Sequence, residues 1–325
     1  MKTRYFLFGL LAALILLWAC SITTDFPEED PEVQKAVQEA EKKTMEVINL
    51  LVEEKATGDS KGVDQFLAQE DPDGEIAALL EDYGGGVAIP IPRDVGVLGE
   101  LWPPELKDFQ DGDVVLFIGN GTSWQNMIMT LVYICDYHHA GVFDEEVAEL
   151  MDDGFFISAT IDVGVNGLCF QTLSELVYTS AVITRLRYYD NPEAVSDGVD
   201  YYNLYTQSVP TLYAFLHLNL EPVSRWNDFL WYCSKVPWRV YMEFGEMDIE
   251  NNYFYFIDGK WEENRDTLFY QLYLKMLKCL LPRWAERWAG YLADRKLCRI
   301  LDELITPDEI RWSGKEINVE HWDNL

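Results

Sequence analysis

Basic side chains are scarce in this chain. Its 325 residues include 25 Lys and Arg against 56 Asp and Glu, which gives a formal net charge of −31 at pH 7. A protein of this charge repels nucleic acids and anionic lipid surfaces over distance, because like charges oppose the encounter. The sequence shows no basic block that would reverse this effect. We therefore expect no DNA or RNA partner.

Metal-binding side chains are also few. The chain has four His and six Cys, and no Cys-x-x-Cys pair. A structural zinc site needs four such ligands at short, characteristic spacings. The sequence therefore does not support a metal site, and it indicates no organic cofactor.

Long apolar runs are absent apart from the first twenty residues. Lys2 and Arg4 precede an apolar run from Tyr5 to Trp18 whose length is typical of an export signal. Leu17-Trp18-Ala19-Cys20 then resembles a bacterial lipobox. We expect residues 1–19 to be a lipoprotein signal peptide and Cys20 to carry the lipid; a plain signal peptide or an uncleaved anchor is the alternative.

Lipidation would place the protein on the periplasmic or cell-surface side of a bacterial membrane, held by acyl chains. Loss of Lys2 and Arg4 with the signal changes the formal charge from −31 to −33. Outside the cytoplasm, the odd number of remaining cysteines permits two disulfides and one free thiol, or five free thiols. These cysteines are Cys135, Cys169, Cys233, Cys279 and Cys298.

The regions that flank the middle of the chain are predicted to be helical. Residues 20–95 begin as an acidic tether and continue as a helical extension, because apolar residues recur at spacings of three and four from Val33 to Leu51. A second helical stretch is interrupted at Pro72. We assign this region a spacing and packing role, with a regulatory or partner-binding helix as the alternative.

Residues 251–325 are predicted as a C-terminal helical extension. Residues 265–304 have a helical pattern that breaks at Pro282, and residues 253–257 are an edge strand or an aromatic loop. The apolar stretch from Leu268 to Leu281 is too short to span a membrane. It is a helix of the core or of a groove, or else a helix that touches a membrane.

Residues 96–250 combine short apolar strands with few helices, which is typical of an α+β domain with a mainly antiparallel sheet. Short β-type runs bounded by turn residues mark the strands. We expect strands at 114–118, 140–143, 155–160 and 181–186, and helices at 124–133, 172–178 and 200–217.

Cys233 and His139 are the candidate catalytic pair. A thiol is nucleophilic as the thiolate, and a nearby imidazole is the usual base that removes its proton. Pro237 suits the first turn of a helix, so a helix should begin at or just before Ser234. Cys233 would then lie at the positive end of a helix dipole, which lowers a thiol pKa.

Four segments in order resemble the permuted papain-like amidases of the NlpC/P60 superfamily, in particular the YiiX/YaeF-like group. They are Gly112-Asp113-Val114-Val115, His139-Ala140-Gly141-Val142, the stretch from Ala159 to Leu173, and Tyr232-Cys233-Ser234 with Trp238 and Tyr241. The tail Ile305-Thr306-Pro307-Asp308-Glu309-Ile310 resembles the ending of the same family. The resemblance implies a permuted papain-like fold, with a small antiparallel sheet, packed helices, and helical N- and C-terminal extensions.

The resemblance also implies roles for single residues. Cys233 matches the nucleophile and His139 the base, whereas Ser158 stands where the family commonly has a carboxylate. A serine hydroxyl orients an imidazole without stabilising the imidazolium, so Asp162 is a candidate substitute. Tyr232 could offer its hydroxyl to an oxyanion or could belong to the core. His138 should face the opposite side of the strand from His139.

We therefore expect a lipid-anchored cysteine hydrolase that cleaves amide bonds in cell-wall peptides or other small amidated substrates through an acyl-enzyme. A lipid acyl hydrolase or transferase is a variant of this function, since residues 265–281 are so apolar. A non-catalytic binding module on the same fold is the alternative from another class, because Ser158 replaces the carboxylate.

Overall fold

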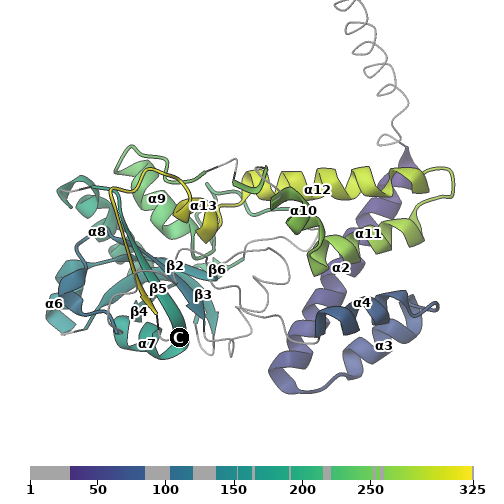
Figure 1. Cartoon of the computed structure of the whole chain (residues 1–325), viewed down its shortest axis with the longest axis horizontal. Helices are drawn as coiled ribbons and strands as arrows, with labels where there is room; N and C mark the ends of the chain where they lie inside the picture. The colour runs from purple at the N-terminus through teal and green to yellow at the C-terminus, as the bar shows by residue number, and fades with distance from the viewer. Residues whose placement is uncertain are drawn as a thin grey trace, which may run out of the picture.

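The computed structural model describes residues 30–84, 103–119, 137–151, 153–162, 165–189, 192–214, 221–251, 254–256 and 260–323 (Figure 1). The predicted signal peptide with Cys20, the predicted helix at 124–133 and Cys135 lie outside these residues. The four cysteines within them, Cys169, Cys233, Cys279 and Cys298, are free thiols. The alternative with two disulfides among the five cysteines is therefore wrong.

A six-stranded antiparallel sheet forms one half of the molecule. Its strand order is β4-β3-β2-β1-β5-β8, and every neighbouring pair is antiparallel. The prediction of an α+β fold with an antiparallel sheet is confirmed. The strands are β1 (Val114–Gly119), β2 (His139–Phe143), β3 (Phe155–Asp162), β4 (Val165–Thr172), β5 (Ser180–Arg187) and β8 (Asn318–Asp323). Strand β4 and strand β8 were not predicted.

Both faces of the sheet are covered, so alternate residues of each strand point into different clusters. On one face, Val115 and Phe117 of β1 pack with Leu173 and Leu176 of α7 (Leu173–Thr179). The short helix α6 (Glu145–Met151) covers the same face. On the other face, Val114, Leu116 and Ile118 pack with α8 (Glu193–Ser208) and α9 (Lys235–Glu243).

A tight turn opens β1, and two of its residues explain the Gly-Asp sequence. Gly112 has φ of +80°, and a Cβ at this position would lie 2.2 Å from Cγ2 of Val195, so only glycine fits. The carboxylate of Asp113 is buried and accepts hydrogen bonds from Nε and Nη2 of Arg187 at 2.8 and 2.6 Å. This bidentate pair joins the start of β1 to the end of β5.

Helices form the other half of the molecule. The long helix α2 (Pro31–Thr57) packs against α11 (Leu268–Leu280), and α3 (Lys61–Glu70) and α4 (Glu75–Gly84) lie beside them (Figure 1). Helix α10 (Lys260–Arg265) precedes α11, and α12 (Ala289–Glu303) follows it across the predicted break at Pro282. The N- and C-terminal extensions therefore form one packed unit rather than two separate ones.

The apolar face of α11 belongs to the core. Leu268, Leu272, Met276 and Leu277 are buried, and they pack in the cluster that also contains Val33, Ala40 and Val47 of α2. The interpretation of this stretch as a core helix accounts for its composition. Among the described residues, no helix is both long and apolar enough to cross a bilayer.

The end of the chain returns from the helices to the sheet. After α12, the short helix α13 (Pro307–Arg311) is completely buried, and β8 then pairs with β5 at the edge of the sheet. The remaining elements are small: η3 (Leu106–Asp108), η4 (Phe254–Phe256), η5 (Glu286–Trp288), β6 (Leu212–Tyr213) and β7 (Leu230–Trp231). Segment 254–256 is thus a 3₁₀ turn rather than an edge strand.

Candidate functional site

Cys233 lies immediately before helix α9. Ser234 is the N-cap residue and Pro237 falls in the first turn, as the sequence predicts. Helix α9 packs against β2 and β3, which brings the cysteine to the sheet. The Cys233 side chain is only 2% exposed. Its position at the start of a helix on the sheet is thus the predicted one, but its degree of burial was not predicted.

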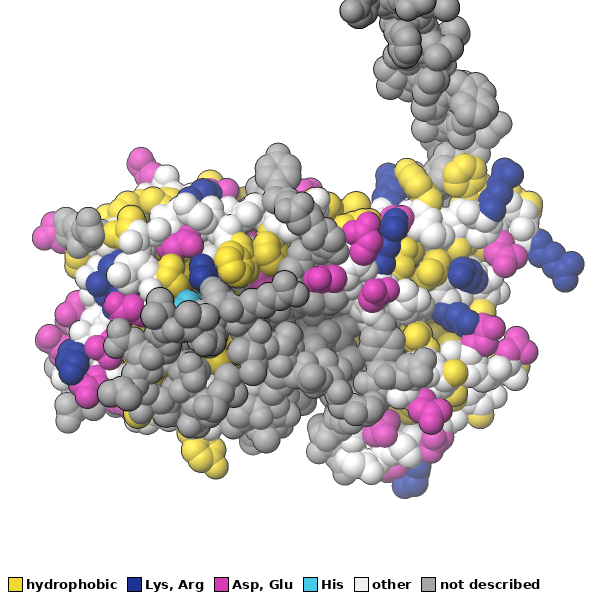
Figure 2. All heavy atoms as spheres, viewed as in Figure 1, with side chains coloured by type: hydrophobic (Ala, Val, Ile, Leu, Met, Phe, Trp, Pro, Cys, Tyr) yellow, Lys and Arg dark blue, Asp and Glu magenta, His cyan; other side chains and the backbone are white. Residues whose placement is uncertain are grey.

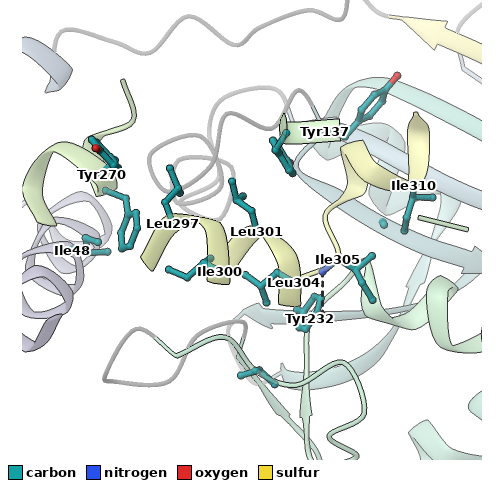
Figure 3. Packing of buried hydrophobic residues seen from close by; sticks show 14 of the residues in the cluster. Ile48, Tyr137, Tyr232, Tyr270, Leu297, Ile300, Leu301, Leu304, Ile305 and Ile310 are labelled. Carbon is teal, nitrogen blue, oxygen red and sulfur yellow. Dashed lines mark hydrogen bonds between the residues drawn. The ribbon is translucent and has the colours of Figure 1, made fainter. Parts of the chain in front are cut away.

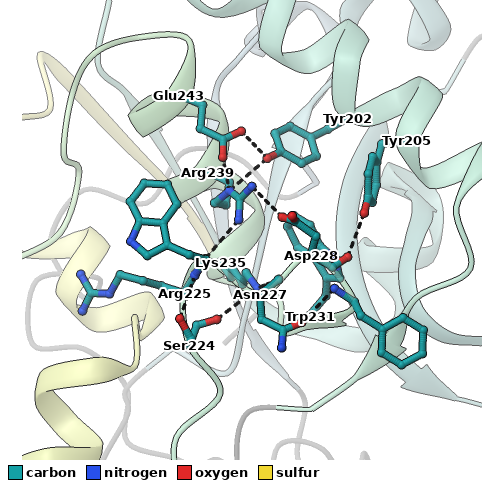
Figure 4. A network of polar contacts seen from close by, with 12 residues as sticks. Tyr202, Tyr205, Ser224, Arg225, Asn227, Asp228, Trp231, Lys235, Arg239 and Glu243 are labelled. Carbon is teal, nitrogen blue, oxygen red and sulfur yellow. Dashed lines mark hydrogen bonds and ion pairs between the residues drawn. The ribbon is translucent and has the colours of Figure 1, made fainter.

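A polar network fixes the loop that leads into Cys233 (Figure 4). The buried Nζ of Lys235, whose pKa burial lowers to about 7, donates hydrogen bonds to the backbone carbonyls of Asn227 and Leu230, the latter at 2.9 Å, and lies 4.6 Å from the Trp231 ring centroid. Arg239 pairs with Asp228 at 2.9 Å. The loop is therefore held by side chains of the helix that it precedes, which makes the position of Cys233 rigid.

The family-like tail clamps the same segment from the other side. Oγ of Ser234 donates to the carbonyl of Ile305 at 2.6 Å, and the hydroxyl oxygen of Tyr232 accepts from the Ile305 N–H at 3.4 Å. Thr306 and Glu309 form a capping box at the start of α13. Figure 3 shows Tyr232 and Ile305 in this buried packing. The hydroxyl of Tyr232 therefore holds the tail, and this geometry gives it a packing role rather than a place at an oxyanion.

The ring of His139 has two polar partners on neighbouring strands. Its Nε2 lies 2.6 Å from Oε1 of Gln171 on β4 and 2.9 Å from Oγ of Ser158 on β3. The Ser158 hydroxyl donates its own proton to the carbonyl of Ala140 at 2.6 Å, and Oε1 of Gln171 can only accept. Both contacts therefore place the ring proton on Nε2. Among the described residues, Nδ1 of His139 has no hydrogen-bond partner, so its lone pair is available to accept a proton.

Gln171 is a site residue that the sequence analysis missed. It lies on β4, opposite Phe156 of β3, and the sequence analysis predicted no strand there. The alternation of Leu168 and Phe170 with Cys169 and Gln171 is the signal that could have found it. With β4 paired to β3, Gln171 reaches the same face of the sheet as Ser158 and His139.

Cys233 lies beside Ala140, the residue that follows His139. Ala140 pairs with Leu116 on the face of the sheet that α9 covers, whereas His139 pairs with Phe117 and its ring packs against Phe117 on the other face. Pairing of β2 with β3 begins at Gly141 and Ser158, so Ala140 is left outside this ladder. The thiol of Cys233 lies within hydrogen-bonding reach of the Ala140 backbone. No hydrogen bond joins the thiol to the His139 ring, although both lie within the described part of the chain. The structure thus brings the nucleophile candidate to the residue that follows the base candidate.

Burial dominates the titration of this pair. It raises the pKa of the Cys233 thiol to about 11, against smaller lowering effects of hydrogen bonds from the backbones of Ala140 and Ser234. Burial also lowers the pKa of His139, although its hydrogen bond to Gln171 raises that pKa. The expectation of a thiol pKa lowered by the helix dipole is therefore wrong, because desolvation of the thiolate outweighs the N-terminal effect of α9.

His138 serves a different contact. Its Nδ1 accepts a hydrogen bond from the N–H of Gly119, at the end of β1, at 3.3 Å. Burial lowers the pKa of His138 to about 4, so the ring is neutral at pH 7. His138 is therefore committed to the β1 side of the strand, while His139 reaches toward β3 and β4.

Asp162 is the last residue of β3, and its side chain lies outside the described residues. It is four residues beyond Ser158, which corresponds to roughly 13 Å along a strand. Within the described chain, no group of three or more His, Cys, Asp and Glu could hold a metal ion.

Comparison with known proteins leaves the family open. No family model matches the chain, and no curated protein matches its sequence. The crystal structure of the metalloprotein yiiX from Escherichia coli O157:H7 is similar over 66% of this chain and 98% of that one, with 15% identity and a TM-score of 0.37. At this identity and TM-score, the likeness carries no argument about chemistry. The function must be argued from the site itself.

Proposed function

We propose that this chain is a cysteine hydrolase on a permuted papain-like fold, with Cys233 as nucleophile and His139 as base. The observation that carries the proposal is the arrangement at Ala140. The thiol lies beside this residue, and the adjacent imidazole is oriented through Nε2 by Gln171 and Ser158. A nucleophile, a base and a group that orients the base are the minimum set for acyl transfer.

The reaction uses these groups in order. His139 Nδ1 takes the proton of the Cys233 thiol as sulfur attacks the carbonyl carbon, and the imidazolium then gives that proton to the departing amine. Water hydrolyses the thioester that remains, with His139 again as base. Gln171 accepts from Nε2–H throughout, so the ring keeps its orientation and its tautomer. The backbone N–H groups of Cys233 and Ser234 are the candidates to stabilise the oxyanion, because those of Lys235 and Val236 already donate to the carbonyls of Tyr232 and Cys233.

The buried thiol changes how the base must work. A thiol with a pKa of about 11 is protonated at neutral pH, so the resting enzyme holds no thiolate–imidazolium pair. Proton transfer and attack then occur together, as in a hydroxyl nucleophile assisted by a base. This predicts slow alkylation of Cys233 in the free enzyme and faster acylation by a substrate that fills the site.

We also propose that the enzyme is lipid-anchored through Cys20 and cleaves amide bonds of cell-wall peptides or other small amidated substrates. The export signal and lipobox in residues 1–20 support the location. The Cys20→Ala variant should leave the membrane fraction or remain unprocessed. If this variant kept its size and its membrane partitioning, the proposal of a lipid anchor would be contradicted, but the proposal of a cysteine hydrolase would still stand.

One observation favours a non-catalytic binding module instead. Cys233 is nearly inaccessible and forms no hydrogen bond with His139. The lipid acyl hydrolase or transferase variant has lost its support, because the apolar stretch from Leu268 to Leu281 is packed in the core. The two remaining functions differ in whether Cys233 ever becomes acylated.

Covalent trapping distinguishes them. We would incubate the protein with cell-wall fragments, peptide esters and simple amides, and follow intact mass after rapid quenching. The expected result is one acyl adduct on Cys233, turnover lost in Cys233→Ala, and turnover unchanged in Cys298→Ala, a half-buried cysteine of α12. Absence of both adduct and turnover with every substrate would favour the binding module.

The orienting groups have a separate test. Removing one oriented hydrogen bond to a catalytic group typically costs ten- to a thousand-fold in rate. We expect Gln171→Ala to lower kcat with little change in KM and to shift the acidic limb of the pH–rate profile downward, because the ring loses a partner that raises the His139 pKa. Ser158→Ala should have a smaller effect. Ser158→Glu should raise the His139 pKa and the rate, if the strand accommodates the longer side chain.

A further inference from the structure

The hairpin of α11 and α12 reverses the charge of the rest of the chain. Residues 275–299 contain seven of the chain's 25 Lys and Arg but only two of its 56 Asp and Glu. The composition of the whole chain hides this segment, which the sequence analysis did not recognise as a basic block. In Figure 2, dark-blue side chains gather over the helical half of the molecule.

The turn of the hairpin presents cations together with aromatic rings. We call this surface the hairpin tip and define it as Lys278, Arg283, Trp284, Arg287, Trp288 and Tyr291. Trp284 and Tyr291 are each 50% exposed and do not belong to the core. Lys278, Arg283 and Arg287 are exposed and form no ion pair with any residue that the structure describes. Trp288 packs partly against the core, but packing in the core does not account for the exposed cations or for Trp284.

The hairpin tip lies beside the start of α2. A cleft of about 320 Å³ is lined by Val33 and Val37 of α2 together with Leu292 and Arg295 of α12, so the first turns of α2 lie directly against α12. The described chain begins at Asp30, ten residues after Cys20. Ten extended residues span at most about 35 Å. Any bilayer reached by Cys20 therefore lies within that distance of the start of α2, which is beside α12 of the hairpin.

We propose that the hairpin tip is a docking surface for an anionic phospholipid bilayer. Trp and Tyr rings favour the interface between headgroups and acyl chains, because one edge of the ring is apolar and the other is polar. Lys and Arg bind the headgroup phosphates, and each contributes to attraction within a Debye length of the surface. The ring of Trp288 lies 5.3 Å from the Arg287 guanidinium carbon, so cation and ring act as one unit.

The net charge of the chain also favours one orientation of the docked molecule relative to the bilayer. An anionic surface attracts the hairpin tip and repels the rest of a molecule whose formal charge is −33 after loss of Lys2 and Arg4 with the signal. The sheet half with Cys233 lies at the opposite end of the long axis from the hairpin (Figure 1). Docking through the tip therefore holds the candidate site away from the lipid and toward substrates in the aqueous phase.

Cys279 offers a direct measurement, because it is an exposed thiol in the last turn of α11, next to Lys278. The full chain, reconstituted through its own N-terminus, would carry an environment-sensitive fluorophore on Cys279, with a Cys279→Ser protein as the labelling background. We compare vesicles of phosphatidylcholine alone with vesicles that contain about a third phosphatidylglycerol. The emission should shift to the blue and gain intensity on the anionic vesicles, and 0.5 M salt should reverse much of this change.

A charge-reversed pair tests the residues. Arg283→Glu with Arg287→Glu should lower the docked fraction on anionic vesicles at least about tenfold, since each basic residue lost weakens attraction to the surface. The matched control is Lys61→Glu with Lys107→Glu, which changes net charge equally at exposed sites far from the hairpin. It should stay within about twofold of the parent protein.

Three outcomes would overturn the proposal. The first is emission that is equal on both vesicle types, which would direct attention to an acidic protein or nucleic acid as the partner of the tip. The second is a charge-reversed protein that docks as well as the parent. The third is a control pair that loses as much docking as the reversed pair, because the effect would then reflect net charge alone.

Discussion

The sheet half and the helical half of this molecule are stabilised in different ways. In the sheet half, buried polar side chains bind the backbone of distant segments, as Ser234 and Tyr232 bind Ile305. In the helical half, apolar stripes of α2 and α11 pack together, and the buried ions pair with one another, as Lys296 does with Glu41 at 2.7 Å. The stability of the sheet half therefore depends on individual hydrogen bonds between distant segments, whereas the stability of the helical half depends on the apolar periodicity of its helices.

The two halves nevertheless share one hydrophobic core. A single cluster runs from Ile48 and Tyr270 through Leu297 of α12 to Tyr232 and Ile310 beside the candidate site (Figure 3). In a closely packed core, unfolding of one part removes packing contacts from its neighbours. We therefore expect one unfolding transition for both halves, and the variants below test where each half is vulnerable.

The largest effect is expected in the helical half, at the buried ion pair. Lys296→Met should lower the free energy of unfolding by about 4 kcal/mol at pH 8, because it leaves the buried carboxylate of Glu41 without its cation. Burial already raises the Glu41 pKa, so the loss should be smaller at pH 5, which is closer to the range in which this carboxylate takes up a proton. Chemical denaturation at the two pH values measures the difference.

The matched control for this pair is the double change Glu41→Leu with Lys296→Met. Replacing both charges by apolar groups of similar size restores most of the lost stability. A double variant as unstable as Lys296→Met would show that the pair is not the source of the effect. Near- and far-ultraviolet circular dichroism should report the same midpoint in every variant.

In the sheet half, the turn before β1 is the sensitive point. Gly112→Ala should cost about 3 kcal/mol, from a residue with a side chain at φ of +80° and from the contact between its Cβ and Val195. Thermal and denaturant unfolding measure the loss. A change of less than 1 kcal/mol would mean that the turn can take another conformation.

His138 should make the sheet half sensitive to acid. Burial depresses its pKa to about 4, whereas an unfolded histidine titrates near 6.5. Between these values the unfolded chain binds the proton and the folded chain does not, so stability falls as pH drops from about 6.5 to 4, by about 3 kcal/mol. His138→Asn keeps a side-chain acceptor for the Gly119 N–H and should remove this slope, which unfolding curves at pH 7 and 4.5 would show.

The smallest effect is expected at Gly290 in α12, and its sign is opposite to that at Gly112. A Cβ at Gly290 would meet nothing within 4 Å, and the backbone is helical there. Gly290→Ala should therefore raise the free energy of unfolding by about 0.5–1 kcal/mol, since alanine loses less backbone entropy in a helix. If alanine changed the free energy of unfolding equally at Gly112 and Gly290, the two halves would not differ in their tolerance of a side chain at these glycines.

The local patterns of the sequence account for much of the fold. Apolar periodicity predicted α2 and α11, proline marked the breaks at Pro72 and Pro282, and short apolar runs predicted β1, β2, β3 and β5. Strand β4 was missed because the alternation in Val165 to Thr172 is confined to the four residues from Leu168 to Gln171, and β8 because Asn318 to Asp323 is largely polar. Both strands depend on pairing with a neighbour rather than on their own composition.

The sequence by itself determined the helical stripes and the start of α9 at Ser234, because caps, prolines and periodicity act over a few residues, and it offered Cys233 and His139 as candidates through their chemistry and the order of the motifs. The tertiary structure decided what these residues meet. It placed Gln171 of the unpredicted β4 against His139, buried the Cys233 thiol so that its pKa rises, and gathered the cations of the α11–α12 hairpin beside the start of α2. Burial, register and contacts between distant segments depend on the whole fold, and no short window of sequence contains them.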